Sequence, residues 1–245
     1  MTDIPTAAAY LADLTRRIGA LFWANAEAIA AAAVAVERTA RQDGLVYVFG
    51  TGHSHILAEE AHYRAGGLAL TVPILSAVTM LHDGSVASTA FERIPGMVAP
   101  VLARYPIGAK DMLIIASNSG VNAAIIEAAE IGRAAGATIV AITSLAYSSQ
   151  AAQGRPRLAD LADVVLDNGA PPGDAVMALP DSELRTGPVS TSIGAALLNA
   201  VFAEAAARLQ AEGGNAPIYR SANMPGAKEI NAGLVARYRP RNPHL

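Results

Sequence analysis

The sequence contains no cysteine, which excludes disulfide bonds, thiolate nucleophiles and cysteine-ligated zinc. It also carries little charge. Asp, Glu, Lys and Arg make up 16% of the 245 residues, and Lys+Arg 18 against Asp+Glu 21 leave a net charge of −3. Because a chain of this charge offers no broad basic face, we expect no nucleic-acid partner.

Long uninterrupted apolar runs are also missing. The alanine-rich stretches are broken by charges such as Glu27, Glu37 and Glu130, so none is expected to have the roughly 20 residues that cross a bilayer. The N-terminal segment carries Asp3 and lacks the basic start of a secretory signal peptide. We therefore expect a cytoplasmic protein with no membrane partner.

The hydrophobic residues, 52% of the chain, are arranged as short apolar runs between helical stretches. These runs predict strands at residues 45–49, 68–75, 111–116, 138–143 and 163–167. Helices are predicted at residues 6–41 (one helix or two), 56–64, 121–135, 190–212 and 227–237, with a mixed helical stretch at 88–105. Residues 168–188 are rich in Gly and Pro and are predicted to form a loop.

This alternation predicts an α/β fold of parallel βαβ units, with helices on both faces of the sheet. We divide the chain into an N-terminal helical arm (residues 1–44), a single α/β domain (residues 45–212) and a C-terminal tail (residues 213–245). Because ligands of such folds gather at the carboxyl ends of the strands, the loops after the strands are the places to look for function.

The first of these loops, residues 50–55, has two glycines between a strand and a helix. Glycine lets the backbone approach a ligand, and a helix N-terminus offers free N–H groups to an anion. A dinucleotide-binding fingerprint would need a third glycine where His55 stands, and a P-loop would need a following Gly-Lys-Ser/Thr. Both are excluded, which leaves an anion-binding turn or a plain strand-to-helix connection.

The loop after the third predicted strand contains Ser117, Asn118, Ser119 and Gly120, and Asn122 follows one turn later. Short hydroxyl and amide groups beside free backbone N–H groups can surround a phosphate monoester without a metal. Helix capping needs only one such residue. Four polar or small residues in a row therefore favour an anion site.

Taken in order, these motifs resemble a sugar isomerase (SIS) domain. The resemblance rests on Gly-Thr-Gly-His-Ser at residues 50–54, Ser-Asn-Ser-Gly at 117–120 and Gly-Ala-Thr-Ile-Val-Ala-Ile-Thr-Ser at 136–144. The whole chain also resembles an uncharacterised bacterial SIS-domain family related to phosphosugar isomerases and N-acetylmuramic acid 6-phosphate etherases. The matching segments include residues 81–84, 92–96, 162–168, 173–175, 187–191 and 221–231.

The resemblance implies a flavodoxin-like, three-layer α/β/α sandwich around a five-stranded parallel sheet. It also implies a homodimer that binds a phosphorylated sugar or amino sugar, with a tail that packs on the domain or on the dimer partner. Ser54, Ser117 and Ser119 would hold the phosphate. The expected phosphate contacts also include Gly52, His53, Asn118, Gly120 and Asn122, the last replacing a Ser or Thr of many relatives with an amide donor.

Aldose–ketose isomerisation needs a base that moves a proton between adjacent carbons. The candidate catalytic residues are Glu60, His82 and Glu92. Weaker candidates for contacts with the sugar are Glu59, Asp174, Thr191 and Lys228. Each has a plainer interpretation, as a solvated charge, a turn residue, a helix cap or, for Glu92, a surface pair with Arg93.

The leading hypothesis is a metal-free aldose–ketose isomerase of a sugar phosphate. The alternatives are a sugar-phosphate lyase or etherase, with Glu92 as its base, and a non-catalytic phosphosugar sensor. His53, His55 and His62 are the only clustered histidines, and His62 lies on the helix after the loop that holds the other two. We therefore expect no metal site and no cofactor.

Overall fold

The computed structural model describes residues 7–211, 213 and 215–245. It confirms the α/β fold, with a five-stranded parallel sheet in the order β2-β1-β3-β4-β5. The strands are β1 (Val46–Gly50), β2 (Thr71–Pro73), β3 (Met112–Ala116), β4 (Thr138–Thr143) and β5 (Val164–Asp167). Every residue of β1 and β3 is buried, because helices cover both faces of the sheet.

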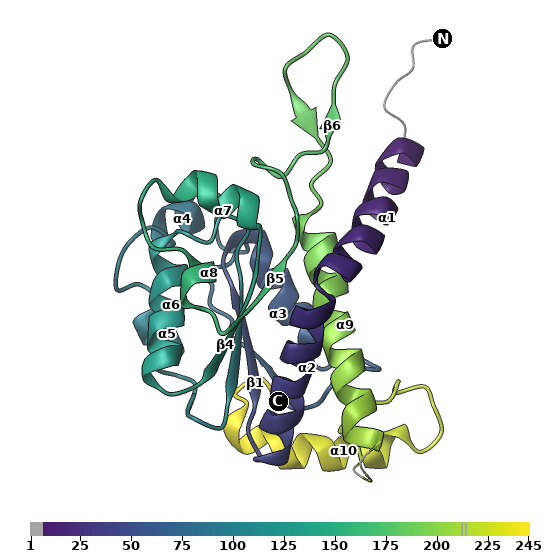
Figure 1. Ribbon diagram of the computed structural model, residues 1–245. Helices are drawn as coiled ribbons and strands as arrows, with labels where there is room; N and C mark the ends of the chain where they lie inside the picture. Colours follow the sequence, from purple (N-terminus) through teal and green to yellow (C-terminus); the bar gives the residue numbers. More distant parts are fainter. Residues whose placement is uncertain (1–6, 212, 214) are drawn as a thin grey trace.

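The helices form two layers around this sheet (Figure 1). On one face lie α2 (Ala26–Arg41), α3 (Ile56–Ala61) and α9 (Ser190–Ala211). Helix α1 (Ala7–Ala24) packs against α9. On the other face lie α5 (Ala99–Leu102), α6 (Ala123–Ala134) and α8 (Leu158–Leu161), with α4 (Ser85–Phe91) nearby. The three-layer sandwich is thus present.

The N-terminal arm consists of two helices, which meet at Asn25 with a bend of 70°. The Asn25 side chain donates to the carbonyl of Asp167 at 3.0 Å and accepts from the Asp167 backbone N–H at 2.8 Å. This pair of hydrogen bonds ties the bend to the end of β5. The predicted helix limits at residues 6 and 212, and the N-terminal segment with Asp3, lie outside the described residues.

Strand β2 is much shorter than the predicted run of residues 68–75. Residues 66–69 pair instead with the C-terminal tail: the Gly66 N–H donates to the Tyr219 carbonyl at 2.8 Å, and Leu68 forms an antiparallel bridge with Ile218. Pro73, which has no N–H to donate, ends the strand at the edge of the sheet. The tail therefore forms the backbone hydrogen bonds of residues 66–69, which a longer β2 would have formed with β1.

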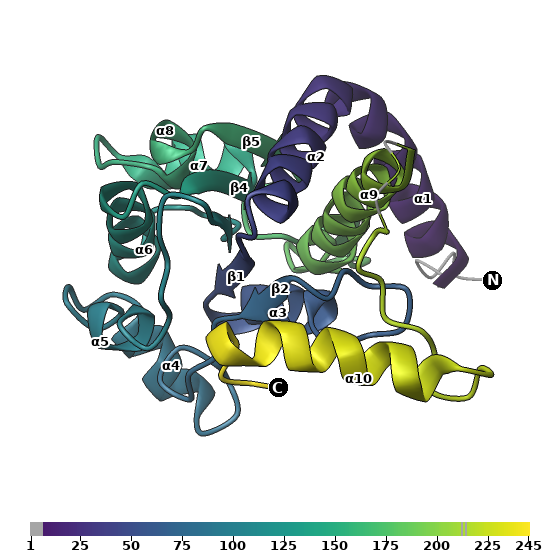
Figure 2. The ribbon, with the colours of Figure 1, turned by 90° about the horizontal axis from the view of Figure 1, so that it is seen from below.

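The tail packs on its own domain at the end of the sheet where the strands begin. Helix α10 (Ala227–Tyr238) crosses this end of the molecule (Figures 1 and 2), followed by the short 3₁₀ helix η2 (Arg239–Arg241). Arg241 donates to the buried Asp111 carboxylate at 2.7 Å. Asp111 also accepts from the backbone N–H groups of Leu45 and Gly108, each at 2.8 Å. One carboxylate thus holds together the tail and the starts of β1 and β3.

Several short elements were not predicted. Helix α7 (Leu145–Ala152) and α8 fill residues 144–162, to which the sequence assigned no element. The predicted loop at 168–188 contains a small hairpin of β6 (Met177–Ala178) and β7 (Arg185–Thr186), which projects from the sandwich on the same side as α1 (Figure 1). The mixed stretch at 88–105 resolves into the end of α4 and the whole of α5.

Among the described helices, α9 has the length and hydropathy of a membrane span, with a mean hydropathy of 1.3 over its best window. This differs from the expectation that no stretch would qualify. The bent pair of α1 and α2 passes the same test as a unit. Helix α9 packs against α2 and α3, and 44% of its window is buried, which fits its place as a core helix of the sandwich.

Candidate functional site

A pocket lies at the carboxyl end of the sheet, where the chain order of the strands changes direction. The connection from β1 leads outward to β2, whereas β3 begins the other half of the sheet, and β1 and β3 are neighbours. Register places Gly50 beside Ala116, so the loops that follow these residues leave the sheet side by side. Ligands of open α/β sheets bind at such a switch point.

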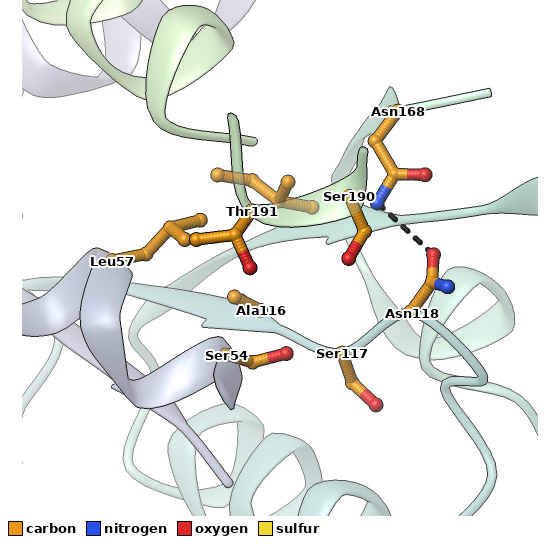
Figure 3. Close-up of a pocket in the computed structure, with 9 residues that line it drawn as sticks. Ser54, Leu57, Ala116, Ser117, Asn118, Asn168, Ser190 and Thr191 are labelled. Carbon is orange, nitrogen blue, oxygen red and sulfur yellow. Dashed lines mark hydrogen bonds between the residues drawn. The ribbon is translucent and has the colours of Figure 1, made fainter. Parts of the chain in front are cut away.

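The pocket is narrow, with a cavity of about 10 Å³ and about 230 Å³ of empty space when its open mouth is included, and Figure 3 shows its lining. Polar groups come from the two predicted loops, from the start of α9 and from Asn168 after β5, and the remaining lining residues are apolar. The lining residues are Ser54, Leu57, Ala116, Ser117, Asn118, Ile142, Asn168, Ser190 and Thr191.

Ser54 reaches the pocket because the chain turns sharply after β1. Residues Gly52–His55 form a short 3₁₀ helix, η1, directly before α3. A Cβ at Gly50 would lie 2.5 Å from the Ser54 carbonyl oxygen, so only glycine leaves room for this turn. Figure 3 shows the Ser54 hydroxyl directed toward Ser117, with the Thr191 hydroxyl on the α9 side of the pocket.

The loop after β3 is held in shape by its own polar groups. The Ser117 hydroxyl accepts from the Gly120 N–H at 3.1 Å and keeps its own proton for donation. The Asn118 side-chain carbonyl accepts from the Asn168 amide at 3.2 Å, the bond drawn in Figure 3. Gly120 has a φ of +62° and would bring a Cβ within 3.1 Å of Thr143, so a side chain would be strained there.

Helix α9 contributes Ser190 and Thr191, and Asp174 fixes its first turn. The Asp174 carboxylate accepts from the backbone N–H groups of Val189 at 3.1 Å and Ser190 at 3.0 Å, and from the Ser190 hydroxyl at 2.6 Å. Asp174 therefore acts on the pocket through Ser190 and is not part of its lining. Thr191, predicted as a weak sugar contact, does line the pocket.

Glu92 connects the two loops. Its carboxylate accepts from the Thr51 hydroxyl at 2.6 Å and from the Asn122 amide at 2.9 Å, and it pairs with Arg93 at 3.0 Å. The Glu92 backbone carbonyl also accepts from the Ala124 N–H at 3.0 Å. Asn122, predicted to contact phosphate, thus directs its amide N–H to Glu92. The predicted Arg93 pair is also present.

Two predicted residues lie away from this pocket. Glu60 pairs with Arg64 and accepts from the Asn199 amide at 2.8 Å, in a separate hollow between α3 and α9. Lys228 is exposed on α10, at the opposite end of the sheet. In this chain neither side chain faces the serine loops. Their predicted roles therefore have no geometric support within one subunit.

The remaining predicted residues lie near the loops that follow β1 and β3 and do not line the pocket. His53 is exposed on η1, and Ser119 and Gly120 continue the loop after Asn118. Glu59 and His82 are exposed and lie close to the buried His55. His62 lies elsewhere, 6.2 Å from the His244 ring, and burial lowers the pKa of both histidines.

Sequence reasoning gave no site role to Ser190 or Thr51. Ser190 is the residue before the predicted Thr191, and a Ser-Thr-Ser sequence at the start of a helix was the available signal. Thr51 lies between the two glycines of the first loop. Its contact with Glu92 depends on a separation of 41 residues, which no local pattern reveals.

Comparison with known proteins agrees with this fold. The SIS domain family model matches residues 9–144, more than half of the chain. The chain is 58% identical over 236 residues to the UPF0309 protein of Brucella anthropi, which covers 96% of this chain and 97% of that protein. The chain belongs to the SIS-domain family. A UPF0309 protein of Brucella canis matches this SIS-domain protein with the same identity and coverage.

Solved structures show the same fold. The phosphoheptose isomerase of Neisseria gonorrhoeae is 22% identical, with a TM-score of 0.54, over 81% of this SIS-domain protein and 95% of that chain. The phosphoheptose isomerase of Francisella tularensis is 17% identical, with a TM-score of 0.56, over 84% of this SIS-domain protein and 98% of that chain. At this identity the likeness establishes architecture, and the chemistry must be argued from the pocket.

The crowding at Gly50 gives a testable prediction. In Gly50→Ala the new methyl meets the Ser54 carbonyl, and we expect a loss of about 1–3 kcal/mol in the free energy of unfolding. Urea unfolding followed by circular dichroism measures this loss. Gly233→Ala, in α10 with nothing within 4 Å of its Cβ, is the control and should be neutral or stabilising by up to about 1 kcal/mol. Equal urea midpoints for wild type and Gly50→Ala would contradict the conclusion that only glycine fits at residue 50.

Proposed function

We propose that this SIS-domain protein binds a phosphorylated sugar or amino sugar in the pocket and interconverts its aldose and ketose forms. The observation that carries the proposal is the convergence of two polar turns, at Ser54 and at Ser117 and Asn118, beside the β1–β3 switch point. The names of the two phosphoheptose isomerases with the same fold support the choice of substrate class.

We assign the two ends of the ligand from the hydrogen bonds that border the pocket. At the start of α9 the backbone N–H groups of Val189 and Ser190 already donate to Asp174. A negatively charged carboxylate therefore lies at this helix terminus. A phosphate dianion would be repelled by that carboxylate, so we assign the phosphate to the serine turns, where α6 begins. Ser190 and Thr191 are then left for the hydroxyls of the sugar.

We assign proton transfer to Glu92. Isomerisation removes a proton from C2 of the aldose, forms an enediol and returns a proton to C1, so it needs one carboxylate held beside both carbons. Glu92 is held by Thr51 and Asn122, one from each loop, which fixes its carboxylate between them. Glu60, bound to Arg64 and Asn199, lacks this position.

Removing the phosphate donors should weaken binding. In Ser54→Ala and Ser117→Ala a hydroxyl that donates to a dianion is lost, and each is expected to lower affinity about 10–100-fold. Calorimetric titration with hexose and amino-sugar 6-phosphates measures the affinity. Ser149→Ala, on the exposed side of α7, is the matched control. Binding that persists unchanged in both variants would remove the phosphate assignment.

Neutralising Glu92 should stop turnover while leaving the ligand bound. We expect Glu92→Gln to lower kcat by about 100-fold or more, with a much smaller change in affinity, because the amide cannot accept the proton. Nuclear magnetic resonance of the aldose–ketose exchange measures the rate. Wild-type protein that binds a sugar phosphate and returns it unchanged would indicate a sensor instead. Release of lactate from N-acetylmuramic acid 6-phosphate would indicate an etherase.

We also propose that the protein is a homodimer. Helix α1 buries no residue and exposes Phe22 (43%) and Trp23 (76%), whose rings meet edge to face at 5.1 Å. Together with Ile18 they line a groove against Leu197 of α9. Because large exposed apolar surfaces mark interaction sites, this groove is the surface we assign to the partner subunit.

A charge in the centre of that surface should separate the subunits. Trp23→Lys is expected to raise the dimer dissociation constant by a factor of about 100 or more, because a buried unpaired charge is strongly unfavourable at an interface. Light scattering after size-exclusion chromatography gives the mass. Val86→Lys, 87% exposed on α4, is the control and should leave the mass unchanged. A wild-type monomer would contradict the proposal.

A further inference from the structure

Beside the pocket, the structure brings together a set of side chains that the sequence did not group. His55 ends η1, Glu59 follows one turn later on α3, and His82 comes from the loop after β2. One ligand atom from each of the three lies within 4.8 Å of the other two. The set differs from His53, His55 and His62, the histidines that are close in the sequence.

The ring of His55 is oriented so that its Nε2 atom can bind a metal ion. Its side chain is buried, with 3% of the residue exposed, and its Nδ1 lies against the Gly52 carbonyl. Because a carbonyl oxygen can only accept, Nδ1 is the donor of this contact, and in the neutral imidazole the lone pair is then on Nε2. Nε2 is buried and has no hydrogen-bond partner. A buried, unsatisfied nitrogen is costly unless a ligand completes it.

Glu59 and His82 are placed to complete the set. Glu59 is four residues after His55, so both side chains share one face of the helical turn, and its Oε1 lies 3.6 Å from His55 Nε2. That separation is too long for a hydrogen bond, but it is close to the roughly 3.3 Å between two ligands of tetrahedral zinc. The His82 ring meets the His55 ring edge to face at 5.0 Å.

The loop that carries His82 is anchored to the same residue that orients His55. The Gly52 N–H donates to the Thr79 carbonyl at 2.9 Å, and the Gly52 carbonyl faces His55 Nδ1. Gly52, with φ of +54°, therefore connects the two histidine-bearing segments. Glu59 and His82 are both exposed, so their side chains are free to rotate the short distance needed to close on an ion.

We propose that His55, Glu59 and His82 bind a divalent transition-metal ion of the zinc class. Two imidazole nitrogens and one carboxylate favour such an ion over Mg²⁺ and Ca²⁺, which prefer all-oxygen sites. Three protein ligands leave a fourth position for water or a substrate oxygen, as in catalytic rather than structural zinc sites. Ser54, the residue before His55, lines the pocket proposed for the sugar phosphate, so the two proposed sites share the η1 turn.

The experiment measures metal binding directly and does not depend on the proposed function. Full-length protein stripped by a chelator is titrated with Zn²⁺ against a chromogenic chelator, and Co²⁺ is added separately to record its absorption bands. We expect one ion per chain and tetrahedral Co²⁺ bands. Glu59→Gln and His82→Ala, both at exposed positions, should lower zinc affinity at least about 100-fold, since loss of even an outer-shell partner costs 10–100-fold.

His53→Ala and Glu60→Gln are the matched controls, because each removes a neighbouring histidine or glutamate outside the set and should bind zinc like wild type. His55→Ala should abolish binding, and circular dichroism checks that it still folds. Weak, non-stoichiometric binding, or binding that Glu59→Gln and His82→Ala leave intact, would overturn the site. Zinc binding with these ligands in a protein that binds no sugar phosphate would retain the site and refute only the proposed function.

Discussion

The pairing of β1 with β3 is the constraint on which the rest of the site depends. These two strands are buried on both faces, and their register places Gly50 beside Ala116 at the carboxyl edge of the sheet. The connections that follow run to opposite sides, so their first residues border a common space. Gly50 adds a steric condition, because the Ser54 carbonyl occupies the volume of a side chain there. A pocket lined by Ser54 and Ser117 follows from these two facts.

Several of the acidic groups near the pocket hold backbone and loops in place. Glu92 bridges Thr51 and Asn122, and Asp174 caps α9 through the Ser190 N–H and hydroxyl. At the other end of the sheet Asp111 does the same for the tail. Such hydrogen bonds pre-organise a site, since the loops need not be ordered when the ligand arrives. For Glu92 the positioning bonds and the proposed proton transfer involve the same carboxylate, which is why kcat and affinity must be measured separately.

The sequence predicted the strands of the central sheet and the two serine loops, because these depend on local apolar runs and on residues adjacent in the chain. It failed where partners are distant. Residues 66–69 pair with the tail some 150 positions later, so β2 was predicted too long. Glu59 and Glu60 show a second limit. Consecutive residues of a helix point in different directions, but only the structure shows that Glu59 turns to His55 and Glu60 to Asn199.

One short turn, η1, connects the two proposed ligand sites. Ser54 faces the pocket, whereas the next residue, His55, is buried against Gly52 and turns toward Glu59 and His82. A 3₁₀ turn advances about 120° per residue, so neighbouring side chains diverge while their backbone moves as one unit. An anion bound at Ser54 and an ion bound at His55 would therefore contact the same four-residue turn. The two sites are coupled to the extent that the ligand at Ser54 and the ion at His55 prefer the same position of this turn.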